Sequence, residues 1–427
     1  MAGLTRRSFL GFGAATAAAV ALPGCGGGDS GGSADGLRVA WYGGDPVHKA
    51  MDKALADFTA DHADLKLSTE RAAFGDYWDK LATQTAGRKG PDVFRMSMSY
   101  YSEYAQRGAL LDLTDKAGSA IKVDTLDKDV AESGRIDGKL MGIGQSSITH
   151  ATFRNPQLVE KLGGKLPAEW SWDSFATFAK DFAGDAGPGK YGTGDAGGQF
   201  QIFEVWSREY GTEVFADGKL AVAKDVIEGW FAYWQDLRKA KAAPGADVTA
   251  EGGSFETSQL SKGASPIEFG WVQQLAFYQP LVKDAELVVG AVPGRTAGSL
   301  KGQFLKALDF WSVSGTTKNP DGAAQVIDFL VNDDRAVKAI GLTLGVPPSK
   351  KSRDLLAAQP NTPAGRAIAY VEQIEQQVGP SPQPWPKGYG ELGTVFTRLN
   401  QDIGFGRTDP AAAADKFASE AGRVLGA

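Results

Sequence analysis

The sequence has a single cysteine and very little histidine. Among its 427 residues, Cys25 is the one cysteine, and the histidines are His48, His62 and His150. One cysteine excludes an internal disulfide and every cysteine-rich zinc site. The histidines belong to no recognisable hydrolase motif, so a nucleophile activated by histidine has no support. We therefore expect neither a metal ion nor a cofactor in this protein.

The sequence also lacks a basic stretch. Its formal net charge is -6, and both signs are interspersed among the 22% of residues that are charged. Phosphate binding requires a basic face, so nucleic acid is not an expected partner. The chain is too long for one ordinary domain, and its 42% apolar content is enough to bury two cores. We expect two lobes.

The first residues have the layout of an export signal. Arg6 and Arg7 precede an almost wholly apolar run from residue 11 to 22, which is too short to span a bilayer as a lasting helix. The paired arginines, followed by Ser-Phe-Leu, resemble the twin-arginine signal that exports folded proteins. We interpret residues 1–24 as a twin-arginine-type lipoprotein signal that is removed.

A lipid anchor is predicted directly after this signal. Leu22-Pro23-Gly24-Cys25 resembles a bacterial lipobox, in which cleavage leaves cysteine as the new N-terminus and lipid is attached to its sulfur. The alternative is a plain signal followed by a cysteine without a role. Residues 25–36 are mainly Gly, Ser and Ala and predict a flexible tether. The lipoprotein interpretation places the protein on the outer face of the cytoplasmic membrane, held by a lipid on Cys25.

The remaining chain alternates short apolar runs with amphipathic segments. Met51, Leu55 and Phe58, for example, lie on one helical face. Strands are predicted at 37–42, 65–71, 92–96, 139–144, 265–270, 287–292 and 307–313, and helices at 47–62, 77–85, 172–182 and 227–240. Such alternation is typical of an α/β protein with mostly parallel sheets covered on both faces. Ligands of such sheets bind beyond the carboxyl ends of the strands.

Aromatic residues are frequent near those strand ends. The chain has ten tryptophans and eleven tyrosines. We expect a core position for the tryptophans on amphipathic helices, namely Trp78, Trp170, Trp172, Trp230 and Trp234. The aromatics at predicted strand ends or in loops are not needed for those helices: Trp41, Tyr42, Tyr100, Tyr101, Trp206, Trp271, Trp311 and Trp385.

Polar side chains accompany these aromatics. They are Asp45, Gln145, Ser146, Glu204 and Glu268. The C–H faces of sugars stack on aromatic rings, and sugar hydroxyls exchange hydrogen bonds with carboxylates and amides. The sequence therefore predicts a ligand site composed of Trp41, Tyr42, Asp45, Tyr100, Gln145, Ser146, Glu204, Trp206, Glu268, Trp271, Trp311 and Trp385.

Several motifs carry a family resemblance that covers essentially the whole chain. They include Gly90-Pro91-Asp92-Val93, the stretch 103–113, Asp137-Gly138-Lys139-Leu140, Phe153-Arg154-Asn155-Pro156, the stretch 167–175, Lys318-Asn319-Pro320 and Gly345-Val346-Pro347-Pro348. As a set they resemble family 1 of the extracellular solute-binding proteins, the maltose-binding type that serves carbohydrate ABC transporters.

The resemblance implies a two-lobed periplasmic-binding-protein-like fold, each lobe a mostly parallel sheet flanked by helices. It implies an N-lobe of residues 37–146 with 303–345 and a C-lobe of 147–302 with 346–427. The chain would cross between lobes near 145–152, 299–306 and 344–350, and a hinge there would let the lobes close on a sugar. The implied partners are the membrane subunits of an ABC transporter, and the implied state is a monomer without enzymatic activity.

Two other functions remain open from the sequence. A secreted glycoside-active enzyme would need two carboxylates roughly 5 to 10 Å apart, for which Glu204 and Glu268 are a pair without a catalytic motif. The same fold could instead bind a polyamine, a metal chelate or an anion. An anion site would require arginine, and Arg71, Arg95 and Arg154 are loosely placed for it.

Overall fold

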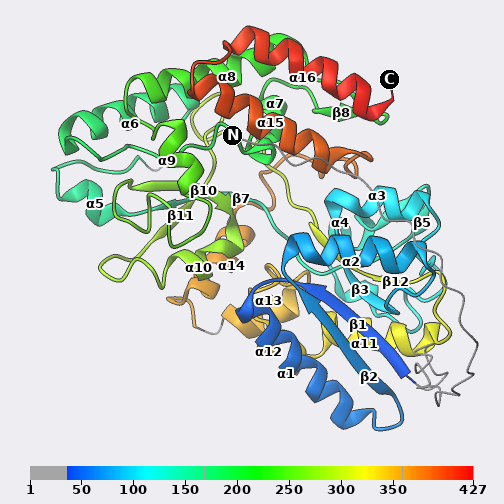
Figure 1. Ribbon diagram of the computed structural model, residues 1–427. Coiled ribbons are helices and arrows are strands. Elements are labelled where there is room, and N and C mark those ends of the chain that lie inside the picture. The colour runs from blue at the N-terminus through cyan, green and yellow to red at the C-terminus, as the bar shows by residue number, and fades with distance from the viewer. Residues whose placement is uncertain (1–35, 168, 358, 427) are drawn as a thin grey trace, which may run out of the picture.

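The computed structural model describes residues 36–167, 169–357 and 359–426, which form an α/β protein of two lobes (Figure 1). This confirms the predicted two-lobed fold. The predicted signal, Cys25 and all of the predicted tether except Gly36 lie outside the described residues. None of the helices in the described ranges is long and apolar enough to cross a membrane.

A five-stranded sheet defines the N-lobe, in the order β2-β1-β3-β12-β6. Its strands are β1 (Gly36–Tyr42), β2 (Lys66–Ala72), β3 (Val93–Ser97), β12 (Asp309–Val313) and β6 (Ile143–Gly144). β1 pairs in parallel with β2 and with β3, as the alternating pattern predicts. β12 returns from the C-lobe and pairs antiparallel with both β3 and β6. The start of β12 therefore lies at the same sheet edge as the ends of β1 and β3.

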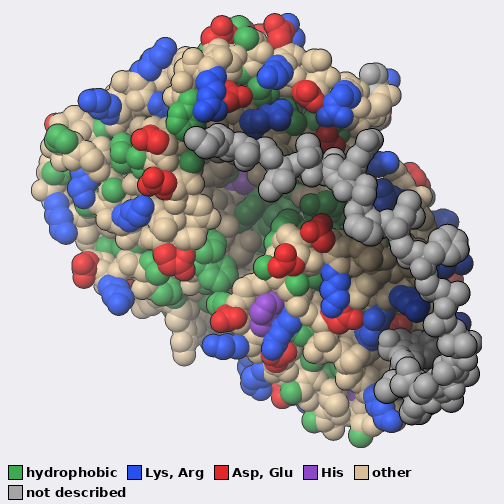
Figure 2. All heavy atoms as spheres, viewed as in Figure 1, with side chains coloured by type: hydrophobic (Ala, Val, Ile, Leu, Met, Phe, Trp, Pro, Cys, Tyr) green, Lys and Arg blue, Asp and Glu red, His purple; other side chains and the backbone are tan. Residues whose placement is uncertain are grey.

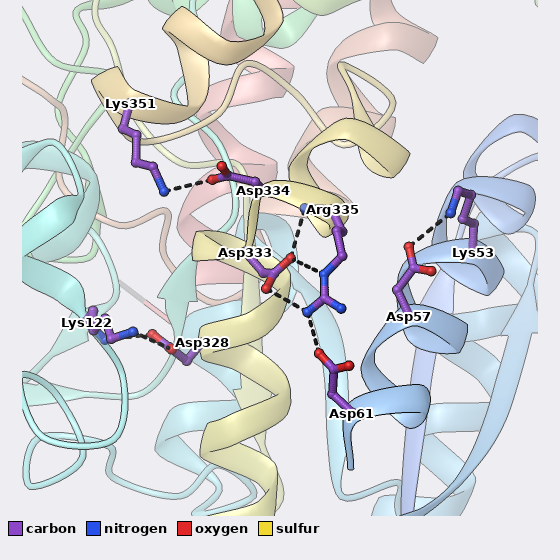
Figure 3. Close-up of polar contacts among 9 residues, drawn as sticks. All are labelled: Lys53, Asp57, Asp61, Lys122, Asp328, Asp333, Asp334, Arg335 and Lys351. Carbon is purple, nitrogen blue, oxygen red and sulfur yellow. Dashed lines mark hydrogen bonds and ion pairs between the residues drawn. The ribbon is translucent and has the colours of Figure 1, made fainter. Parts of the chain in front are cut away.

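Helices cover both faces of this sheet. They are α1 (Asp45–Asp61), α2 (Phe74–Ala86), α3 (Met98–Gln106), α4 (Lys128–Glu132), α11 (Pro320–Asn332) and α12 (Asp334–Ile340), with a 3₁₀ turn at Val123–Thr125 and a hairpin of β4 (Arg135–Ile136) and β5 (Lys139–Leu140). The strand predicted at 139–144 is thus divided between β5 and β6. Polar contacts join the outer helices, as where Arg335 bridges Asp61 and Asp333 (Figure 3). Exposed pairs of this kind add little stability.

A three-stranded sheet defines the C-lobe, in the order β10-β7-β11. Its strands are β7 (His150–Arg154), β10 (Ile267–Trp271) and β11 (Val288–Gly290). Both outer strands pair antiparallel with β7, so the expected parallel sheet is not found in this lobe. The alternation of strands and helices does not fix strand direction here: β10 and β11 run parallel to each other, and β7 lies between them in the opposite direction.

Most helices of the C-lobe lie above or beside this sheet, and α10 and α14 lie below it (Figure 1). The helices of this lobe are α5 (Pro156–Glu160), α6 (Trp172–Ala186), α7 (Phe200–Glu209), α8 (Lys224–Lys239), α9 (Ala246–Glu251), α10 (Leu275–Tyr278), α14 (Pro363–Ile374), α15 (Tyr389–Gly404) and α16 (Pro410–Leu425), with β8 (Phe215–Ala216), β9 (Lys219–Leu220) and a 3₁₀ turn at Val272–Gln274. α13 (Lys350–Ala357) contacts both α12 and α14.

Two of the family motifs are helix starts. The side chain of Asn155 accepts a hydrogen bond from the Leu158 N–H at 3.1 Å, and that of Asn319 accepts from the Gly322 N–H at 2.9 Å. A proline follows each asparagine, and its fixed φ and missing N–H suit the first helical position. The asparagine-proline pairs therefore begin α5 and α11.

Three segments pair with one another where the chain passes between the lobes. Ile148 and Lys306 exchange backbone hydrogen bonds at 3.1 Å, and the Ser147 N–H donates to Val346 O at 2.8 Å. These positions fall within the three segments where the sequence predicts crossings. Gly345 lies beside them with φ +115°, and a Cβ on it would be 2.4 Å from the Ser146 Cβ. The crossing thus has no room for a side chain at residue 345.

We predict that Gly345→Ala lowers the free energy of unfolding by about 3 kcal/mol, because the new methyl group meets Ser146 and the backbone is left-handed. Gly341→Ala is the matched control: its backbone, with φ +55° and ψ −128°, is also unfavourable for alanine, but nothing lies within 4 Å of the added carbon. Because only backbone strain is added there, it should cost about 1 to 2 kcal/mol. Urea unfolding of both variants measures the difference, and equal losses would contradict the tight crossing.

Candidate functional site

The structure brings seven of the twelve predicted site residues to the region where the lobes meet. They are Tyr42, Tyr100, Gln145, Ser146, Glu204, Trp271 and Trp385, whereas Asp45 is exposed at the start of α1. Figure 2 shows a hollow between the two lobes with hydrophobic side chains deep inside it. On one side of this junction the lobes touch, because the Ser102 hydroxyl of α3 donates to the Trp385 carbonyl at 2.6 Å. The other four residues lie elsewhere.

Trp41 and Trp311 lie in the N-lobe core with no exposed surface. Successive side chains of a strand point to opposite faces, and Trp41 shares its face of β1 with Leu37 and Val39. Their indole N–H groups donate within the lobe, to His48 and to Gln145. The prediction that these two rings contact ligand is therefore wrong in this conformation, because a position at a strand end does not decide which face a side chain occupies.

Trp206 and Glu268 belong to the interior of the C-lobe. Trp206 lies within α7, not at a strand end, and packs against Trp172 and Trp230 with ring centroids 5.3 and 5.5 Å away. The Glu268 carboxyl accepts the Phe269 N–H, and burial raises its pKa to about 8. Asp195, not Glu204, is the carboxyl that perturbs this pKa. The structure therefore gives no sign that Glu204 and Glu268 act as a pair.

The N-lobe side of the junction has a buried ion pair at the sheet edge. The Arg95 guanidinium lies 2.6 Å from the Asp309 carboxylate and 4.2 Å from the centre of the Tyr42 ring. The Tyr42 hydroxyl donates to Asp309, and burial raises the pKa of Tyr42 well above its usual value. Tyr42 is thus fixed in place by its own lobe, and its hydroxyl already has a partner.

A group of aromatic rings extends from Tyr42 toward the C-lobe. Phe74 lies 5.0 Å from Tyr42, and Trp78 lies 4.1 Å from Tyr100, measured between ring centroids. Phe74 is 47% exposed and Tyr100 is partly exposed. The exposed part of this group faces the C-lobe across a cavity.

That cavity has a volume of about 530 Å³ and lies between the lobes. The N-lobe contributes Phe74, Ser99 and Tyr100, and the C-lobe contributes Phe200, Gln201, Tyr389, Gly390, Thr394, Thr397, Arg398 and Gln401 among others. Aromatic rings and polar groups from both lobes therefore border one space. Its volume lies within the range of small-molecule sites.

Trp385 joins two buried charges at the junction. Its indole N–H lies 3.3 Å from both Glu204 oxygens, its ring stacks on Tyr389 at 3.8 Å, and the Lys306 ammonium lies 4.0 Å from its centre. The Tyr389 ring lies parallel to the indole and covers one of its faces, so the ammonium must lie over the opposite face. Both faces are therefore covered, and Trp385 supports Glu204 and Lys306 instead of offering a free platform.

Lys306 is the buried charge that the sequence analysis missed. It has no exposed surface, and its ammonium has no hydrogen-bond partner within the described protein. Burial lowers its pKa to about 8, with Glu204 acting in the opposite direction and Arg208 adding to the decrease. Burial likewise raises the pKa of Glu204, while Lys306 and the Trp385 N–H oppose the rise. The sequence feature that could have identified this residue is a lone lysine in the otherwise apolar stretch 304–308.

His150 is the second residue that was missed. Its ring lies 3.9 Å from the partly exposed Trp271 ring, and both of its nitrogens are buried without a partner. The Ser146 hydroxyl and the Tyr389 hydroxyl are also buried without a partner at the junction. Unpartnered buried polar atoms are uncommon in native proteins, and each requires an explanation. Other such atoms lie inside the lobes, but those at the junction could exchange hydrogen bonds with a polar solute that enters between the lobes.

Burial lowers the pKa of His150 well below its usual value, and Lys306 and Arg208 lower it further. Because the unfolded chain binds a proton near pH 6.5 and the folded protein does not, the free energy of unfolding should decrease as the pH falls below 6.5. One proton contributes about 1.4 kcal/mol per pH unit.

We predict that His150→Gln removes this one-proton contribution, measured by urea unfolding between pH 7 and pH 5. His62→Gln is the control, because His62 is partly exposed in the N-lobe, and it should keep the wild-type slope. An unchanged slope in His150→Gln would contradict the buried neutral histidine.

Comparisons with known proteins agree with the fold. The chain is 27% identical to family 1 extracellular solute-binding protein from Alicyclobacillus acidocaldarius, with a TM-score of 0.71 over 91% of this chain and 98% of that one. A periplasmic oligogalacturonide-binding protein from Yersinia enterocolitica, solved with saturated digalacturonic acid, has 22% identity and a TM-score of 0.78 over 92% and 98% of the chains.

An uncharacterized lipoprotein of Streptomyces antibioticus is 24% identical in an alignment over 399 residues that covers 87% of this chain and 82% of that one. Residues 53–367 match the family described as bacterial extracellular solute-binding proteins. This match spans most of the chain. The protein therefore belongs to the bacterial extracellular solute-binding protein family.

Proposed function

We infer that the protein captures a sugar or oligosaccharide at the lobe junction and delivers it to an ABC importer. The observation that carries this proposal is the group of buried polar atoms without partners at Ser146, His150, Lys306 and Tyr389. A hydroxyl group both donates and accepts hydrogen bonds, so a polyhydroxylated solute can supply the missing partners of all four residues. Partly exposed rings at Phe74, Tyr100 and Trp271 would stack on its C–H faces.

The charge balance of the junction favours a neutral solute. Arg95 is already paired with Asp309, and Arg208 with Glu213. The remaining charges are Lys306 and Glu204, which have opposite signs, and Arg398, which borders the cavity. A polyamine would need several free carboxylates and a polyanion several free cations. The described junction residues offer a polyamine only Glu204 and a polyanion only Lys306 and Arg398, so a saccharide fits better than either of these alternatives.

Lobe closure would couple binding to transport. A solute that contacts both lobes stabilises the closed form by interactions that the open form cannot make. The cavity between Tyr100 and Tyr389 and the contact of Ser102 with Trp385 support such interactions on both sides of one gap. We propose that the membrane subunits of the importer recognise this closed form, and that the binding protein acts as a monomer.

Export and anchoring follow from the proposed signal. A lipid on Cys25 would hold the two lobes at the outer face of the cytoplasmic membrane, and the tether up to residue 36 would give them reach toward the transporter. The solute-binding family and the lipoprotein relative are in accord with this placement.

The first test of this proposal is titration calorimetry of the purified protein against mono- and oligosaccharides. For a saccharide that binds, Trp271→Ala and Tyr100→Ala should each weaken binding about tenfold, because each removes a stacking ring. Trp41→Phe is the control: it alters the N-lobe core and should lower stability without changing affinity. If polyamines or anions bind and no saccharide does, the cargo assignment is wrong.

The anchor is tested in cells of the source organism. Cys25→Ser should move the protein from the membrane fraction to the soluble exported fraction, because a single thioether-linked lipid group is lost. Ser30→Ala in the same tether is the control and should leave the protein in the membrane fraction. Membrane retention of Cys25→Ser would contradict a lipid on this cysteine.

A further inference from the structure

Arg154 is a buried cation without a counter-ion among the described residues. It is the last residue of β7 and is 4% exposed. Its guanidinium donates to the Thr152 hydroxyl at 2.8 Å and to the carbonyls of Pro167 and Ala291 at 3.3 and 3.0 Å. All three acceptors are neutral. Since each terminal nitrogen makes a single hydrogen bond, two N–H groups of the fork have no acceptor.

The other buried arginines of the described chain differ from it. Arg95 is paired with Asp309, Arg208 with Glu213, and Arg353 with Asp127. Buried arginine is rare unless it is paired, because removal of its charge from water costs several kcal/mol. Burial lowers the pKa of Arg154 to about 10, which agrees with the missing carboxylate. Arg154 thus differs from the other buried arginines, each of which has a carboxylate partner.

The surroundings of Arg154 fit its side chain closely and leave a cavity beside the guanidinium. Gly290 lies so close that a Cβ there would be 2.1 Å from the guanidinium carbon, and the Trp170 ring supports the same carbon at 4.2 Å. The guanidinium borders a cavity of about 350 Å³, which we call the Arg154 cavity. Its other walls include Leu166, Val289, Tyr370 and Gln373.

The Arg154 cavity is separate from the lobe junction. Its described lining residues come from β7, the start of α5, residues 288–292, residues 298–300, α14 with Gln377, and residues 166, 167, 169 and 170. All of these are in the C-lobe, and none comes from the five-stranded sheet or its helices. β7, β11 and α14 lie together in Figure 1. Binding there would not require lobe closure, so this inference does not depend on the proposed sugar site.

We propose that the Arg154 cavity is a second binding site, in which the guanidinium holds the carboxylate of a small organic acid and the apolar walls cover its hydrocarbon part. The two free N–H groups match the two oxygens of one carboxylate. A single guanidinium compensates one negative charge, whereas phosphate carries more. The exposed Glu169 at the cavity would repel a second anionic group. A monocarboxylate with an apolar body is therefore the class that fits.

The test uses benzoate and hexanoate as probes, with benzamide and hexanamide as neutral matches and inorganic phosphate as a further arm. At least one acid should raise the melting temperature of the full-length protein and show saturable binding in calorimetry. The amides and phosphate should not. Arg154→Met should weaken acid binding more than tenfold.

Gln373→Trp provides a second variant, since Gln373 is exposed at the cavity and an indole there would obstruct it. It should also weaken acid binding more than tenfold, whereas Gln376→Trp, exposed but outside the lining, should bind normally. If Arg154→Met does not fold, the comparison of Gln373→Trp with Gln376→Trp decides whether the acid binds in the Arg154 cavity. Equal binding of amides, binding of phosphate alone, wild-type affinity in Gln373→Trp, or no acid binding up to about 10 mM would each overturn the proposal.

Discussion

The pairing of three extended segments between the lobes is the constraint on which the rest of the molecule depends. Backbone hydrogen bonds join Ile148 to Lys306 and Ser147 to Val346, so the first crossing segment is bound to the other two. Lys306 and His150 belong to or adjoin these segments, and both are buried where the lobes meet.

Burial of these groups has a physical consequence for binding. A polar group that is buried without a partner costs free energy, and the cost is recovered when a solute supplies the missing hydrogen bond. Trp385 separates Lys306 from direct pairing with Glu204, since the ammonium lies over the ring and the carboxylate accepts from its edge. The two charges are therefore held apart and remain able to bind different atoms of one hydroxylated solute. Rings from both lobes add contact area around them.

The sequence predicts the order of the main strands and helices well, because the apolar periodicity of segments such as 37–62 depends on local residues alone. It does not predict the direction of β10 and β11, which is set by where β7 inserts between them. Site prediction fails at Trp41 for a related reason. The carboxyl end of a strand identifies the correct edge, but the two faces of β1 differ, and Tyr42, not Trp41, is on the face toward the aromatic group. Lys306 was missed because its role depends on three segments distant in sequence.

The central claim is that a solute completes the unpartnered polar atoms at the junction. It is tested most directly by a crystal structure of the protein with the saccharide that binds most tightly. The account predicts saccharide oxygens within about 3.2 Å of the Lys306 ammonium and of a His150 ring nitrogen. A saccharide bound elsewhere, with Lys306 and His150 still lacking partners, would contradict it.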